Sequence, residues 1–231
     1  MPRLPVDLVA FDLMGTVIED TGAMDRALKR TLSHHKVPFN QQEVDAMRGA
    51  AKVEVFRAVA ERALGAGGSP EACLELAEKM YRTFKQALRD AYAETPPVEI
   101  PGAAATMRWL RERGVKVAAT SALDTDQLGP MLDRLGWAEG VFDCKVSTYE
   151  VPRGRPAPYM IFQAMMRTGV VDVRRVAAVG DTPLDLMAGT NAGLRWVIGV
   201  LSGAHRLESL GVVPHTHILN SVADLPRILE G

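Results

Sequence analysis

Residues 6–16 read VDLVAFDLMGT, a short and mostly apolar run that ends at Asp12 and is followed by a turn containing Gly15. Such a run, closed by turn residues, predicts a buried β-strand. A glycine three residues after the aspartate lets backbone N–H groups approach an anion closely. An aspartate in this position is more often a simple turn or helix cap, so a functional role for Asp12 needs support from other parts of the chain.

Similar apolar runs recur much later and alternate with helical patterns. The predicted strands are residues 115–119, 176–179, 196–200 and 216–219, and the predicted helices between and beside them are residues 103–113, 125–135, 158–168 and 185–191. This alternation predicts the α/β class, with a Rossmann-like, doubly wound parallel sheet. Polar residues follow three of the strands, and ligands in such sheets bind outside the carboxyl ends of the strands. We therefore expect the site at that edge.

The segment between the first two predicted strands has helical periodicity and no convincing strand. Its predicted helices cover residues 23–35, 41–47, 52–63 and 69–93, with a glycine-rich break at residues 65–68. We predict two domains, a core formed by residues 1–16 and 96–231 and an inserted all-helical cap formed by residues 17–95. Because the insert leaves the core directly after the Asp12 turn, we expect its helices to cover the site and exclude water.

Composition excludes several classes of function. The chain has 231 residues, 47% of them hydrophobic, and a formal net charge of -1. It therefore has enough apolar side chains for a substantial core and no overall positive field, so we expect no nucleic-acid partner. Its two cysteines form no disulfide or zinc pattern, and no apolar run approaches a membrane span. We expect a cytoplasmic protein with no membrane partner.

Two later motifs carry further charged groups to the expected site. Asp181 follows a predicted strand in the sequence GDTPLD, with Asp185 four residues further on, and such a pair of carboxylates suits a hard cation such as magnesium. Taken alone, Asp185 would only favour a helix N-terminus. Arg155, in VPRGRPAP, is a cation between a glycine and a proline ahead of a helix, where an isolated GRP is usually a surface turn.

The order of these motifs resembles that of the haloacid dehalogenase superfamily over the whole chain. The resemblance implies a magnesium-dependent hydrolase in which Asp12 attacks phosphorus and forms an aspartyl-phosphate. It implies that Ser121 and Arg155 hold the phosphoryl oxygens and act with Asp12 in catalysis. The residues implied to bind substrate are Gly15, Thr16, Ser121, Ala122 and Arg155, and those implied to bind Mg²⁺ are Asp12, Met14, Asp181 and Asp185.

Met14 departs from the pattern of most phosphatases of this superfamily, which have an aspartate there as general acid and base. A thioether cannot donate a proton, and such help is typically worth roughly 10² to 10⁴-fold in rate. The protein is therefore a poor monoesterase, or inactive, or handles its leaving group elsewhere. The last option matches the phosphonatase branch, which is similar in having a small or apolar residue here whose backbone carbonyl binds the metal.

Phosphonatases cleave a phosphorus–carbon bond, and a lysine imine formed with the substrate aldehyde accepts the electrons. In that branch the lysine follows a glycine in a helix-to-helix loop of the cap, and Lys52 in GAAK matches it by position. The simpler interpretation is a solvent-exposed lysine, and related sugar-phosphate mutases carry an arginine there that contacts phosphate.

Several other stretches also resemble the phosphonatase-like group, among them TSALDTDQLGPMLDRLGW, YEVPRGRPAPYM and VGDTPLDLMAGTNAG. Phosphonoacetaldehyde hydrolases carry a histidine where this chain has Val55 and a tyrosine where it has Leu123, so the substrate stays open between a small phosphonate and a phosphorylated metabolite. The alternatives are a phosphate monoester phosphatase, a sugar-phosphate mutase-like enzyme and a phosphate-binding protein without turnover. The family also implies a homodimer that pairs through the cap.

Overall fold

The computed structural model describes residues 3–230, and within them the chain divides into two compact units. The sheet unit contains the residues up to Asp20 and those from Pro97 onward, and the helical unit is Thr21–Pro96. Residues 17–20 thus lie in the sheet unit, although we predicted them in the helical insert. The reason is backbone pairing, because Ile18 forms bridges with both Met14 and Glu99.

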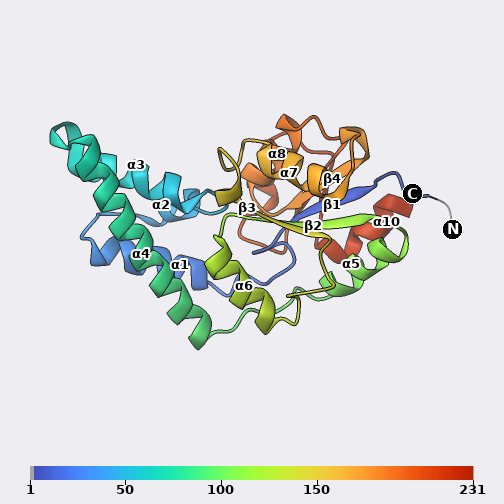
Figure 1. Cartoon of the computed structure of the whole chain (residues 1–231), viewed down its shortest axis with the longest axis horizontal. Coiled ribbons are helices and arrows are strands. Elements are labelled where there is room, and N and C mark those ends of the chain that lie inside the picture. The colour runs from blue at the N-terminus through green and yellow to red at the C-terminus, as the bar shows by residue number, and fades with distance from the viewer. Residues whose placement is uncertain (1–2, 231) are drawn as a thin grey trace. The chain divides into compact units, whose positions relative to one another are not determined.

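The sheet unit is built on a six-stranded sheet, as far as residues 3–230 show (Figure 1). Its order is β3-β2-β1-β4-β5-β6, and every neighbouring pair is parallel, which confirms the predicted fold class. The strands are β1 (Leu8–Asp12), β2 (Lys116–Ser121), β3 (Cys144–Ser147), β4 (Val176–Gly180), β5 (Trp196–Val200) and β6 (His217–Leu219).

Helices cover both faces of this sheet. They are α5 (Ala103–Glu112), α6 (Thr125–Arg134), α7 (Tyr159–Thr168), α8 (Pro183–Asn191), α9 (Leu207–Leu210) and α10 (Leu225–Glu230). Figure 1 shows α7 and α8 on one face and α5 and α10 on the other. Every residue of β1 and β4 is buried, as expected for central strands of a parallel sheet with helices on both sides. Asp12 therefore ends a strand in the middle of the sheet.

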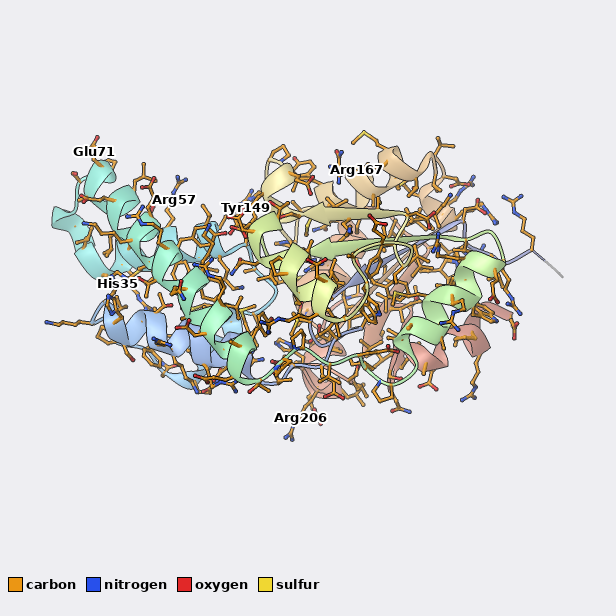
Figure 2. The ribbon with its side chains drawn as sticks, turned by 60° about the horizontal axis from the view of Figure 1, so that its bottom comes forward. His35, Arg57, Glu71, Tyr149, Arg167 and Arg206 are labelled. Carbon is orange, nitrogen blue, oxygen red and sulfur yellow. The ribbon has the colours of Figure 1, made fainter. Side chains whose placement is uncertain are left out.

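Strand β3 is absent from our sequence prediction. Its four residues, CKVS, contain a single strongly apolar side chain, because β3 is an edge strand and only half buried. Pairing with β2 holds it in place, and so does Arg167 of α7, labelled in Figure 2. The Arg167 guanidinium donates to the Lys145 carbonyl at 2.5 Å and to Glu150 at 2.7 Å. These contacts join residues that are far apart in the sequence, so no local sequence pattern predicts the strand.

The helical unit consists of α1 (Ala23–His34), α2 (Gln41–Ala46), α3 (Lys52–Leu64) and α4 (Pro70–Glu94), with a 3-10 turn at Gly65–Gly67. Helix α4 begins where Ser69 accepts a hydrogen bond from the Ala72 N–H and Pro70 occupies the first turn. It packs against α1 and α3, and the rings of Phe56 and Phe84 lie 5.6 Å apart in that interface. Among the described residues, no helix combines the length and apolar character needed to cross a bilayer.

Candidate active site

Arg155 links two of the predicted site carboxylates. Its guanidinium lies 2.7 Å from Asp12 Oδ1 and 2.9 Å from Asp185 Oδ1, and its side chain is buried. It also donates to the hydroxyl of Thr120 at 2.7 Å and to the carbonyl of Thr120 at 3.2 Å. A buried cation thus faces two buried anions, and a strand-end threonine holds its orientation.

Asp12, Asp181 and Asp185 form a buried acidic cluster. One ligand oxygen from each lies within 4.8 Å of the others. Burial raises the pKa of Asp12 to about 7, with Arg155 opposing the shift and Asp185 adding to it. Burial also raises the pKa of Asp181 well above its usual value, and the charges of Asp12 and Asp185 add to it. Three convergent carboxylates with a single guanidinium beside them fit a hard divalent cation such as Mg²⁺.

The strand-to-helix junction between β4 and α8 sets the direction of Asp185. The Asp185 N–H donates to Thr182 Oγ at 3.3 Å and the Thr182 N–H donates to Asp185 Oδ2 at 3.1 Å, which forms a capping box at the start of α8. The Thr182 hydroxyl also donates to Asp185 Oδ2, at 2.6 Å. A Cβ on Gly180 would lie 2.2 Å from the Cβ of Asp185, so only glycine fits there. Asp185 is therefore a helix-capping residue, and its other oxygen also faces Arg155.

The turn after β1 lies against Asp181. The Thr16 hydroxyl donates to Asp181 Oδ1 at 3.2 Å, and Gly15 has a φ of 84°, in the left-handed region that favours glycine. A Cβ on Gly15 would also lie 2.4 Å from Asp181 Oδ2. Met14, the residue before this glycine, forms a backbone bridge with Ile18. The turn after Asp12 and the aspartate that opens GDTPLD are thus in direct contact.

Other predicted site residues are less closely connected. Ser121 ends β2 and is buried, and its Oγ accepts the N–H of Leu123 at 3.1 Å, with Ala122 between them. Lys52 opens α3 in the helical unit and is 1% exposed, and its Nζ donates to the carbonyls of Met47 at 2.9 Å and Ala50 at 2.8 Å. The roles of Ser121, Ala122 and Lys52 stay predictions.

Sequence reasoning missed three residues that hold the site together. Thr120 anchors Arg155, Ser202 donates to the Gly15 carbonyl at 2.9 Å, and the Ala204 N–H donates to Asp181 Oδ2 at 2.8 Å. A polar residue one position before the end of a buried strand was an available signal for Thr120. Nothing local distinguishes Ser202 or Ala204, since both act through contacts across the sheet edge.

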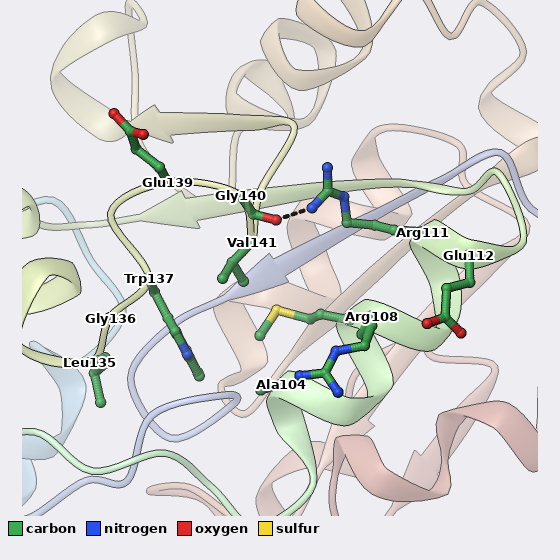
Figure 3. A pocket seen from close by; sticks show the side chains of 11 residues that line it. Ala104, Arg108, Arg111, Glu112, Leu135, Gly136, Trp137, Glu139, Gly140 and Val141 are labelled. Carbon is green, nitrogen blue, oxygen red and sulfur yellow. Dashed lines mark hydrogen bonds between the residues drawn. The ribbon is translucent and has the colours of Figure 1, made fainter.

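A groove of about 650 Å³ lies elsewhere on the sheet unit, between α5 and the loop that follows α6 (Figure 3). The Trp137 ring points toward α5, and Arg111 donates to the Gly140 carbonyl. Its four charged lining residues are two arginines and two glutamates, Arg108, Arg111, Glu112 and Glu139. The lining contains no member of the acidic cluster, and its two arginines are balanced by two glutamates.

Among known proteins, the chain is similar to several that are named phosphonoacetaldehyde hydrolases. The chain is 34% identical to the phosphonoacetaldehyde hydrolase of Parabacteroides distasonis over 134 residues, which are 56% of this chain and 48% of that protein. It is 28% identical to the phosphonoacetaldehyde hydrolase of Bordetella avium over 264 aligned positions, covering 100% of this chain and 92% of that protein.

A solved structure of a phosphonoacetaldehyde hydrolase-like protein from Oleispira antarctica has the same fold. Its TM-score is 0.82 with 22% identity, and the match covers 98% of this chain and 92% of that one. The model of the haloacid dehalogenase-like hydrolases matches residues 6–193. That match spans most of the sequence, and the chain therefore belongs to the haloacid dehalogenase-like hydrolases.

Proposed function

We propose that the protein is a Mg²⁺-dependent hydrolase that forms an aspartyl-phosphate on Asp12 and acts on a small phosphonate or phosphorylated metabolite. The observation that carries this proposal is the buried cluster of Asp12, Asp181 and Asp185, whose ligand oxygens lie within 4.8 Å of one another beside Arg155. A bound Mg²⁺ would offset the charge of these carboxylates and of an incoming phosphoryl group. Asp12, Asp181, Asp185 and the Met14 carbonyl would hold it.

In the proposed reaction, a carboxylate oxygen of Asp12 forms a bond to phosphorus while the bond from phosphorus to the leaving group breaks. The electron pair of that bond stays with the leaving group. Water then attacks the aspartyl-phosphate, which releases inorganic phosphate and regenerates the carboxylate. Arg155 and Ser121 would stabilise the charge that develops on the phosphoryl oxygens.

A panel of phosphonates and phosphate esters, assayed for phosphate release with Mg²⁺ and with EDTA, tests this proposal. We expect release from at least one compound, its loss in EDTA, and a fall of roughly 10³-fold or more in Asp12→Asn, because an amide cannot replace the attacking carboxylate. Asp133→Asn is the matched control, because Asp133 is exposed on α6. Equal release by the wild type and Asp12→Asn across the panel would instead indicate a phosphate-binding protein without turnover.

We further propose phosphorus–carbon cleavage, with Lys52 as the imine-forming lysine. The named relatives are phosphonoacetaldehyde hydrolases, and Met14 offers no proton to an alkoxide leaving group. Lys52 is buried, and the carbonyls of Met47 and Ala50 hold its amine in a fixed position. The imine would take up the electron pair of the broken phosphorus–carbon bond as an enamine, which is then protonated and hydrolysed to acetaldehyde and the free lysine.

Borohydride trapping tests the imine. Wild-type protein treated with phosphonoacetaldehyde and sodium borohydride should lose activity irreversibly and gain the mass of the reduced adduct on the peptide that contains Lys52. Lys52→Arg should gain no such mass, whereas Lys79→Arg, a change at an exposed lysine of the same unit, should behave as wild type. Full activity after borohydride would rule out the imine and leave the aspartyl-phosphate proposal standing.

A second candidate is a phosphatase or mutase that cleaves a phosphorus–oxygen bond. Val55 and Leu123 favour it, because phosphonoacetaldehyde hydrolases carry a histidine and a tyrosine at these positions. The Leu123 side chain is buried and apolar, so it contributes to the core and offers no hydroxyl in place of the tyrosine. Release of phosphate from esters but not from phosphonates in the same panel would support the phosphatase or mutase and exclude phosphorus–carbon cleavage.

A further inference from the structure

Both carboxylate oxygens of Asp181 accept hydrogen bonds, and the two donors come from different parts of the chain. The Thr16 hydroxyl, in the turn after β1, donates to Oδ1 at 3.2 Å. The Ala204 backbone N–H, in the loop after β5, donates to Oδ2 at 2.8 Å. Asp181 is 1% exposed, so these two contacts rather than solvent set the direction of the carboxylate plane.

The loop after β5 also contacts the turn that follows Asp12. The Ser202 hydroxyl donates to the Gly15 carbonyl at 2.9 Å, and this bond joins residues 187 positions apart in the sequence. Ser202 thus holds the same turn whose Thr16 contacts Asp181. The loop is therefore bonded to the acidic cluster through the Ala204 backbone and to the turn after Asp12 through the Ser202 side chain.

Close packing restricts the same three segments. A Cβ on Gly203 would lie 2.0 Å from Asp181 Oδ2, and a Cβ on Gly15 would lie 2.9 Å from the Gly203 Cα. Contacts below 3.0 Å to backbone or to a buried carboxylate require something to move. The loop can therefore lie this close to Asp181 only because residue 203 is a glycine.

We propose that Ser202, Gly203 and Ala204 form a brace that positions Asp181 and the Gly15 turn for a divalent cation. The brace residues are positioning residues that act through Asp181. This inference rests on the proposed metal site. It adds that the brace helps to set the affinity of that site for the cation. Partners that orient a metal ligand typically change metal affinity by roughly 10–100-fold when they are removed.

The test measures cation binding to the full chain without substrate, by calorimetry for Mg²⁺ and by electron paramagnetic resonance for Mn²⁺. We expect dissociation constants about 10-fold weaker in Ser202→Ala, restored in Ser202→Thr, which keeps the hydroxyl, and weaker still in Gly203→Ala. Ser209→Ala is the matched control, a serine of α9 in the same part of the chain, and should bind as wild type.

Kinetics give a second measurement. In Ser202→Ala the Mg²⁺ concentration for half-maximal rate should rise about 10-fold, while kcat at saturating Mg²⁺ returns to near the wild-type value. Wild-type cation affinity in Ser202→Ala would overturn the brace and leave the proposed function intact. Absence of cation binding in the wild type would overturn both. Gly203→Ala carries no weight if it fails to fold, because the pair Ser202→Ala and Ser202→Thr decides alone.

Discussion

Thr120 uses its one hydroxyl twice. It donates to the Phe11 carbonyl at 3.1 Å and accepts from Arg155 at 2.7 Å, so β1, β2 and the buried cation are joined through a single side chain. In the sheet register Thr120 is the partner of Asp12. Thr120 has no acid–base chemistry of its own. It nevertheless orients Arg155, whose guanidinium contacts Asp12.

Replacing Thr120 tests this control. Thr120→Val keeps the shape but removes the hydroxyl, and we expect kcat/KM to fall roughly 10- to 150-fold, since a hydrogen bond to a charged group is worth roughly 1.5–3 kcal/mol. Thr120→Ser keeps the hydroxyl and should retain most of the activity. Steady-state kinetics on the best substrate of the panel, with thermal unfolding to check the fold, measure the effect. Equal loss in both variants would assign the effect to packing.

At the scale of elements, the start of α8 both caps the helix and places a carboxylate in the acidic cluster. The capping box that satisfies the first turn of the helix uses Asp185 and Thr182, and the same Asp185 carboxylate faces Arg155. Helix α4 has a simpler cap, in which Ser69 accepts one backbone N–H. The two helix starts differ because the capping box of α8 contains a residue of the acidic cluster, Asp185, whereas the cap of α4 contains none.

The two caps should therefore respond differently to the same kind of substitution. Thr182→Ala and Ser69→Ala should each lower the free energy of unfolding of the affected unit by about 1 kcal/mol, the usual cost of a lost cap. Only Thr182→Ala should also lower activity, because it removes the hydroxyl that donates to Asp185 Oδ2 and leaves that oxygen with the residue 182 backbone N–H alone. Urea denaturation and the kinetic assay separate these effects. Unchanged activity in Thr182→Ala would show that Arg155 and the backbone N–H of residue 182 suffice to orient Asp185.

At the scale of the whole molecule, buried like charges oppose folding. The pKa of Asp12 is about 7 in the folded protein and 3.8 as an ordinary aspartate, so the folded state binds more protons than the unfolded state between these values. Stability from this group is therefore complete below about pH 4 and is lost as the pH rises toward 7. Asp181, whose pKa is also raised, acts in the same direction.

We expect the free energy of unfolding of the metal-free protein to contain a decline of up to about 1.4 kcal/mol per pH unit from Asp12 between pH 5 and 7. Asp12→Asn should remove that decline, and saturating Mg²⁺ should reduce it because the ion competes with the proton. Urea titrations in EDTA and in Mg²⁺ at several pH values measure both effects. Identical pH profiles for the wild type and Asp12→Asn would contradict the burial of an ionisable Asp12.

The sequence by itself determined the alternation of strands and helices, the helical insert and the motif residues Asp12, Arg155, Asp181 and Asp185. These features are local, because apolar periodicity, helix caps and strand-end polar residues are all visible within a few positions. It also indicated which edge of the sheet should carry the site, since parallel strands end together.

Only the tertiary structure decided the edge strand β3, the return of residues 17–20 to the sheet unit, and the contacts of Thr120, Ser202 and Ala204. Each depends on partners far away in sequence: β3 on pairing with β2, Ile18 on its bridge to Glu99, and Ser202 on the Gly15 carbonyl. Such contacts arise where separate strand ends meet, and their geometry is set by backbone register and close packing, which leave no periodic signal in the chain.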